Sequence, residues 1–261
     1  MKEMGEEVRR LVIEMSHRSR SGETGSSLSI SDLLAVLYFK IMHVDPKKPN
    51  DPMRDRFVLS KGHGAAALYA VLALRGYFPI KKLLGHRMNN GAFHGHPSKG
   101  AAPGIEVSTG SLGHGLSIAA GMAFALKNSK SKVYVLLGDG ECNEGSIWEA
   151  ALFIGNAQLP NIIAIIDDNK FQGFGATKET NRFSLGAQWR SFGWEVLKAD
   201  GHDPKDIEKK LKEAAKLKKP TVLIADTISG KGVAHIEHTL GAHYYVPAQT
   251  DIRPSGKKIK K

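Results

Sequence analysis

Short apolar segments alternate with helix-like segments along this chain, and this alternation restricts the possible fold more than any other feature. The segments 133–137 (VYVLL) and 162–166 (IIAII) are apolar throughout, so we expect both faces of each strand to be buried. Buried strands that alternate with helices predict an α/β protein, with a parallel sheet and helices on both of its faces. The expected strands lie in 56–64, 133–137, 161–166, 194–199 and 221–227.

Helical periodicity and capping patterns place the helices between these strands. Ser29 and Asp32 are spaced as a capping box, which predicts that a helix begins at Ser29 after a glycine- and serine-rich loop. From residue 81 to residue 105 the chain is rich in Gly, His and Pro, so we expect irregular structure there. The other expected helices span about 4–20, 65–76, 116–127, 146–158 and 203–220.

Composition and charge narrow the class of protein. The 261 residues are enough for one domain with its own core, and we expect that domain at 1–250 and a flexible basic tail at 251–261. The net charge is +11, and part of the excess comes from lysines on the outer face of the 203–220 helix. A solvent-exposed helix face explains these lysines better than a nucleic-acid-binding surface does. We find no run of about 20 apolar residues and no signal peptide, so a cytoplasmic protein is expected.

Polar residues follow two strands that the pattern places side by side. Asp139 stands between two glycines directly after one strand, and Asn169 follows the next strand 30 residues later. In parallel α/β sheets, ligands bind beyond the carboxyl ends of the strands. A carboxylate, an amide oxygen and a backbone carbonyl suit Mg²⁺, whose octahedral shell two phosphate oxygens and a water would complete. Either half alone is common in turns and helix caps, so the spacing carries the prediction.

Five segments of the chain carry a recognisable combination of motifs: RDRFVLSKGHG (54–64), GHP (95–97), STGSLGHG (108–115), GDGECNEG (138–145) and DDNKFQ (167–172). Together they resemble one enzyme family, the transketolases. The resemblance runs from about residue 5 to residue 247 and covers the N-terminal domain that binds thiamine diphosphate and Mg²⁺ (the PP domain). It implies a split transketolase, whose separate partner subunit carries the pyrimidine-binding and C-terminal domains, and an α₂β₂ heterotetramer.

The resemblance also assigns roles to individual residues. It implies that Asp139, Asn169 and the backbone carbonyl of Phe171 bind Mg²⁺. Glu144 corresponds to the family's glutamate at the subunit interface, and Tyr244 stands where the family has a glycine. The implied catalytic residues are His63, His96 and His243. The implied cofactor-binding residues are His63, Gly110, Ser111, Leu112, Gly140, Glu144, Asn169 and His243.

One departure from the family pattern falls in the segment that follows the first helix. Glu23 and Thr24 occupy the positions of a histidine and a proline that the family usually has. A glutamate cannot donate as an imidazolium does, and an ionised carboxylate repels anions. We therefore expect a different donor or acceptor, a different reaction on the same cofactor, or a weakened enzyme.

The implied reaction moves a two-carbon ketol unit from a ketose, with or without a phosphate, to an aldose, and it needs the partner subunit. Two other functions stay open: a thiamine-dependent condensation similar to that of deoxyxylulose-phosphate synthase, and a scaffold subunit without catalysis. A zinc site could form from His86, His94 and His96, or from His235, His238 and His243.

The chain has a single cysteine, Cys142, which rules out an internal disulfide framework. Cys142 could act as a nucleophile, but nearby acidic residues favour the neutral thiol, so we expect it to serve packing.

Overall fold

The computed structural model describes residues 1–252 and contains a five-stranded parallel sheet. Short strands that are buried on both faces pair in parallel because helices can then cover each face. The predicted α/β class is confirmed, and each predicted strand is present within a few residues of its expected place. Along the sheet the strands are β1 (Arg56–Leu59), β2 (Val133–Gly138), β3 (Ile162–Asp168), β7 (Thr221–Asp226) and β6 (Glu195–Asp200).

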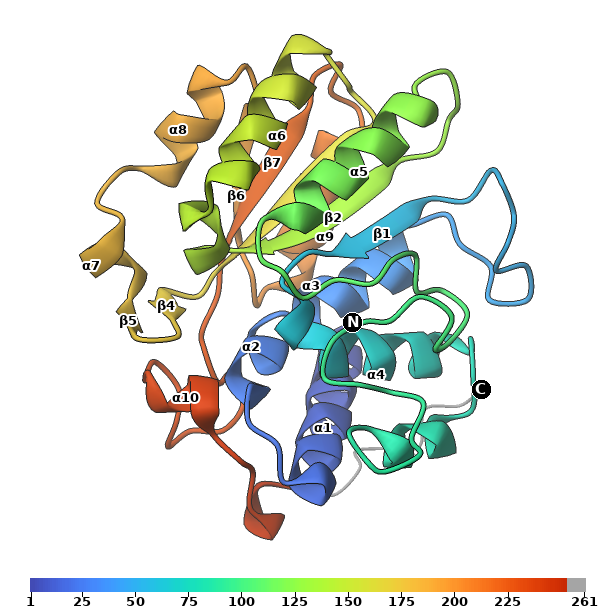
Figure 1. Cartoon of the computed structure of the whole chain (residues 1–261), viewed down its shortest axis with the longest axis vertical. Coiled ribbons are helices and arrows are strands. Elements are labelled where there is room, and N and C mark those ends of the chain that lie inside the picture. Colours follow the sequence, from blue (N-terminus) through green and yellow to red (C-terminus); the bar gives the residue numbers. More distant parts are fainter. Residues whose placement is uncertain (253–261) are drawn as a thin grey trace.

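Helices pack on both faces of the sheet and bury two separate apolar clusters (Figure 1). One face is covered by α1 (Lys2–Ser19), α3 (Ser31–Val36), α4 (Ala65–Arg75) and α9 (Pro204–Ala214). The opposite face is covered by α5 (His114–Ala125), α6 (Gly145–Asn156) and α8 (Leu185–Ser191). In the part of the chain that the structure describes, no helix is long and apolar enough to cross a membrane.

The chain between the first two long helices differs from the prediction. A short helix, α2 (Thr24–Ser29), replaces the expected loop, and a π-helical turn, Leu37–Ile41, continues α3. The capping box is wrong, because Ser29 donates its hydroxyl to the Asp167 carboxylate at 2.8 Å. Asp32 instead accepts from Arg9 at 2.6 Å. Both side chains that the local pattern assigns to a helix cap therefore bind residues from distant parts of the chain instead.

Several short elements gather at the carboxyl edge of the sheet. A hairpin of β4 (Phe171–Gln172) and β5 (Gly175–Ala176) follows β3, and the turns Gly62–Gly64 and Gly140–Asn143 follow β1 and β2. The helix α10 (Gly241–Tyr244) packs on α2 near this edge (Figure 1). The remaining short elements are α7 (Thr177–Thr180) and the 3₁₀ turns Ile80–Gly85 and Gln249–Asp251. Most of the predicted tail, 253–261, lies outside the described residues, and the single domain at 1–250 stays a prediction.

Candidate cofactor and metal site

A cavity of about 280 Å³ lies beyond the carboxyl ends of β2 and β3. Its walls come from seven separate segments of the chain, which only the folded sheet brings together. Eight of the predicted site residues line it: His63, Leu112, Asp139, Gly140, Glu144, Asn169, Phe171 and His243. Its lining also includes Ser26, Lys61, Glu141 and Ser229, to which the resemblance assigns no role.

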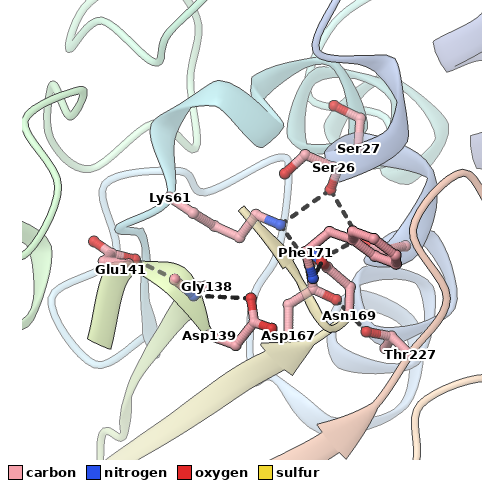
Figure 2. A network of polar contacts seen from close by, with 12 residues as sticks. Ser26, Ser27, Lys61, Gly138, Asp139, Glu141, Asp167, Asn169, Phe171 and Thr227 are labelled. Atoms are coloured by element: carbon pink, nitrogen blue, oxygen red, sulfur yellow. Dashed lines mark hydrogen bonds and ion pairs between the residues drawn. The ribbon is translucent and has the colours of Figure 1, made fainter. Parts of the chain in front are cut away.

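Asp139 and Asn169 follow neighbouring strands, as their spacing predicts. Gly138 is paired with Asp167 in the register of β2 and β3, so the residues after each strand leave the sheet side by side. The Asp139 backbone N–H donates to the Asp167 carbonyl at 3.2 Å and extends this pairing by one residue. Figure 2 shows Asp139, Asp167 and Asn169 grouped at this edge.

The Asp139 carboxylate is buried, with 1% of the residue exposed, and it has no ion-pair partner in residues 1–252. One oxygen accepts from the Gly140 N–H at 2.8 Å, and the other from the Lys170 N–H and the Thr177 hydroxyl, both at 2.8 Å. Burial, together with the charge of Asp167, raises the pKa of Asp139 to about 7. A cation beside this carboxylate would offset the free-energy cost of burying its negative charge. The oxygen that accepts from Gly140 keeps a lone pair with which it could bind such a cation.

Asn169 is oriented so that its amide oxygen is a second candidate ligand. Its Nδ2 donates to the Asp167 carboxylate at 2.8 Å, which fixes which end of the amide faces the cavity. Its Oδ1 accepts only the Phe171 N–H, at 3.0 Å, and keeps a lone pair. The described residues contain no cluster of three His, Cys, Asp or Glu side chains able to hold a metal. The oxygen donors therefore fit a hard divalent cation whose remaining ligands come from a bound molecule.

A buried ion pair between Lys61 and Asp167 lies next to these candidate ligands and holds Asn169 in position. Lys61 donates to the Asp167 carboxylate at 2.5 Å and to the Ser26 carbonyl at 3.2 Å (Figure 2). The Lys61 side chain is 1% exposed and that of Asp167 is fully buried. Burial raises the pKa of Asp167, but Lys61 and the hydroxyl donors Thr227 and Ser29 outweigh it, so the net shift is downward. Asp167 stays ionised and holds Asn169 in place.

Three histidines that the resemblance implies lie around the cavity. The rings of His63 and His243 are 5.9 Å apart, and both residues line the cavity. His96 does not line it, but its ring lies against Gly62 and Gly110, within 3.1 and 3.5 Å of the positions that Cβ atoms would take there. Burial and the nearby Lys61 charge lower the pKa of His63 to about 3, so its ring is neutral near pH 7. The pKa of His243 is lowered by the same two causes.

The loop 108–113 reaches the cavity through Leu112, whereas Gly110 and Ser111 do not line it. A buried carboxylate holds this loop, because Glu141 accepts the Gly113 N–H at 2.8 Å, the Gly138 N–H at 3.0 Å and the Ser60 hydroxyl at 2.5 Å. Gly113 has a φ of +82°, and a Cβ there would lie 2.2 Å from the Ser146 hydroxyl. Only glycine fits this position without strain.

Glu23 occupies a place that the sequence could not predict. Its carboxylate forms an ion pair with the Arg87 guanidinium, across 64 residues of chain. The repulsion of anions that we expect from a free glutamate is therefore offset by a positive charge. Arg87 comes from the irregular segment 81–105, where no periodic pattern indicated a partner.

The other candidate chemistries find less support in the described residues. Cys142 is fully buried, and this burial, together with Glu141, raises the pKa of its thiol well above the usual value. A buried neutral thiol is a poor nucleophile. Neither of the two histidine triplets forms a metal-holding cluster in residues 1–252.

Ser26 and Ser229 carried no recognisable sequence signal, since each is one serine in a loop-like segment. The Ser26 hydroxyl is buried and has no hydrogen-bond partner in the structure. A buried hydroxyl without a partner is costly, which makes it a candidate to bind a ligand in the cavity. Lys61 lies two residues beyond β1, at a strand end where ligands are expected, and a buried lysine there needs a buried counter-charge.

Comparisons with known proteins identify the family that this chain matches. Residues 1–258 match the family described as "Transketolase, thiamine diphosphate binding domain". The chain is 43% identical over 240 residues to the 6-deoxy-6-sulfo-D-fructose transketolase subunit SqwG of Clostridium sp. (strain MSTE9), covering 90% of this chain and 87% of that protein. It is 41% identical over 266 residues to one subunit of the apulose-4-phosphate transketolase of Phocaeicola vulgatus, covering 98% and 94%.

Solved transketolase structures also match this chain, but the match covers a smaller share of their length than of the two subunit relatives. The transketolase from Campylobacter jejuni superimposes with a TM-score of 0.91 at 33% identity, over 96% of this chain and 41% of that one. The transketolase from Leishmania mexicana superimposes with a TM-score of 0.92 at 29% identity, over 96% and 40%. The chain thus spans about two fifths of these solved proteins and most of the two subunit relatives.

Proposed function

The chain belongs to the transketolase family, and we propose that it is the thiamine diphosphate-binding subunit of a two-subunit transketolase. The reaction transfers a two-carbon ketol unit from a ketose to an aldose. The single observation that carries the proposal is the cavity where Asp139 and Asn169 each keep an oxygen lone pair beside His63 and His243. Relatives that this chain covers nearly end to end are named as transketolase subunits, which supports a two-subunit enzyme.

Asp139, Asn169 and the Phe171 carbonyl are our proposed ligands for Mg²⁺, which would balance the charge of a bound diphosphate. When bound, thiamine diphosphate supplies a ring that accepts the electron pair of the cleaved carbon–carbon bond. The chain holds that cofactor through Leu112, Gly140 and the unpartnered hydroxyl of Ser26. Gly140 is also required by packing, since a Cβ there would lie 2.7 Å from the Gln172 Cβ.

The histidines supply proton transfer and hydrogen bonds to the sugar. His63 is neutral near pH 7 because its pKa is about 3, so it can accept through one ring nitrogen and donate through the other. We propose that His96 and His243 hydrogen-bond to hydroxyl groups of the substrate and to the charge that develops on oxygen.

We further propose that the partner subunit supplies the pyrimidine-binding half of the site, in an α₂β₂ assembly, and that the chain alone does not turn over. Glu144 lines the cavity and is our candidate for the contact that joins two subunits. This arrangement predicts weak cofactor binding by the isolated chain and tight binding by the complex.

The test is an assay of the purified chain with and without its co-expressed partner, in the presence of thiamine diphosphate and Mg²⁺. The substrates are ketoses with and without phosphate or sulfonate groups, each paired with an aldose acceptor, and products are identified by mass spectrometry. We expect a ketose two carbons longer than the acceptor, and only when both subunits are present. Decarboxylation of pyruvate without ketol transfer, or full activity from the chain alone, would contradict the proposal.

A scaffold role predicts a different outcome in the same experiment. A scaffold subunit would assemble with the partner but would leave cofactor binding unchanged when its own cavity is altered. Replacing Asn169 by Ala therefore separates the two functions: we expect the variant complex to lose cofactor affinity. Unchanged affinity in an assembled complex would favour the scaffold.

A further inference from the structure

An ion pair between Glu23 and Arg87, from two distant segments, lies next to His243, which lines the cavity. The Glu23 carboxylate accepts from the Arg87 guanidinium, and both side chains remain about 30% exposed (31% and 28%). Both residues have left-handed backbones, with φ values of 63° and 51°. Non-glycine residues rarely adopt this conformation unless the surrounding structure imposes it.

Backbone contacts fix each partner beside one of the histidines. The Glu23 N–H donates to the His243 carbonyl at 2.9 Å, so the pair is anchored to the residue whose ring lies 5.9 Å from His63. The Arg87 N–H donates to the Phe93 carbonyl at 2.7 Å. The Arg87 guanidinium lies over Gly95, where a Cβ would be 2.5 Å from Nη2, and Gly95 directly precedes His96.

Packing of aromatic rings against the segment from Arg87 to His96 further restricts the position of Arg87. Tyr69 donates its hydroxyl to the His96 carbonyl at 2.9 Å, and its ring lies 4.7 Å from that of Phe93. The segment from Arg87 to His96 is thus tied to the core helix α4 at several points. A salt bridge held this firmly presents fixed polar groups, because little side-chain entropy remains to be lost when a ligand binds.

We propose that the Glu23–Arg87 pair determines donor specificity by binding an uncharged, hydroxyl-bearing part of the ketose and discriminating against donors with an anionic group at that position. This inference rests on the proposed transketolase function and deepens it. The carboxylate accepts hydrogen bonds from hydroxyl groups, and the guanidinium donates to their oxygens. Because the two charges cancel, the pair attracts neither anions nor cations, whereas either partner alone would.

The test compares two donors in the two-subunit enzyme. Xylulose is uncharged, whereas hydroxypyruvate carries a carboxylate beside its carbonyl and loses CO₂ when its ketol unit is transferred. We measure the ratio of kcat/KM for hydroxypyruvate to kcat/KM for xylulose in the wild type, in Glu23→Gln and in Arg87→Met. Glu23→Gln leaves Arg87 unpaired, so the ratio is expected to rise about ten-fold.

Arg87→Met leaves Glu23 unpaired, and the ratio is expected to fall about ten-fold. A pair that only clamps two loops together predicts shifts in the same direction, or a lower Tm with no change in the ratio, and either result overturns the inference. Arg10→Met is the matched control, because Arg10 pairs with Glu7 and Glu14 along α1. That variant is expected to keep the wild-type ratio.

Binding without turnover separates this inference from the proposed function. The preference between the two donors is measured by saturation-transfer NMR on the two-subunit protein without cofactor. If the wild type transfers no ketol unit, the proposed function is wrong, but opposite shifts of binding preference in the two variants still support specificity at this ion pair. If ketol transfer occurs and both variants bind the donors as the wild type does, only the specificity role is wrong.

Discussion

Replacing Lys61 by Met tests whether the ion pair beneath the site is as important to stability as its burial implies. Lys61 and Asp167 are at most 1% exposed and 2.5 Å apart, and Lys61 also satisfies the Ser26 carbonyl. The variant leaves a buried carboxylate with hydroxyl and amide donors but no counter-charge. Removing one partner of a buried pair costs about 3–5 kcal/mol in free energy of unfolding, since the uncompensated charge remains.

Urea unfolding at pH 7 measures this loss. The double variant Lys61→Met with Asp167→Asn is expected to recover most of it, because no unpaired charge is left. Lys210→Met is the surface control: Lys210 pairs with Glu213 at 3.1 Å on the exposed face of α9, and its loss should cost less than about 0.5 kcal/mol. Equal stability of Lys61→Met and Lys210→Met would refute the reasoning.

Two further predictions concern the loop at the cavity and a buried histidine. Gly113→Ala places a Cβ 2.2 Å from the Ser146 hydroxyl, so calorimetry should show weaker thiamine diphosphate binding, while Gly121→Ala, with open space at its Cβ, should not. Burial lowers the pKa of His86 to about 4, below its unfolded value of 6.5. The unfolded state therefore binds the proton more readily, and His86 costs about 2 kcal/mol of stability between pH 6.5 and pH 5. His86→Leu should flatten the decline of urea stability in this range; an unchanged decline would contradict the prediction.

The sheet, and the edge where Asp139 and Asn169 lie, were predictable because the sequence patterns that indicate them are local. Continuous apolar segments such as 162–166 can only be buried strands or core helices, and their short length and β-branched residues favour strands. Asp139 and Asn169 then fall side by side because parallel strands end at one edge. This part of the site follows from chain order and strand direction alone.

The polar partners were not predictable because they depend on contacts between distant segments. Ser29 and Asp32 have the spacing of a capping box, yet Asp167 and Arg9 bind them more favourably in the fold. Arg87 lies in a segment with no hydrophobic period, so nothing in the sequence linked it to Glu23. Local patterns indicate which side chains are polar and near an edge, but not which buried charges neutralise one another.

The most direct test of the proposed cofactor site is calorimetry of thiamine diphosphate binding to the two-subunit protein, with and without Mg²⁺. The wild type is expected to bind more than about ten-fold more tightly when Mg²⁺ is present. Asp139→Asn should remove this dependence, and Asp226→Asn, which alters a carboxylate whose side chain is 75% exposed, should keep it. A full Mg²⁺ effect in the Asp139→Asn variant would contradict the account.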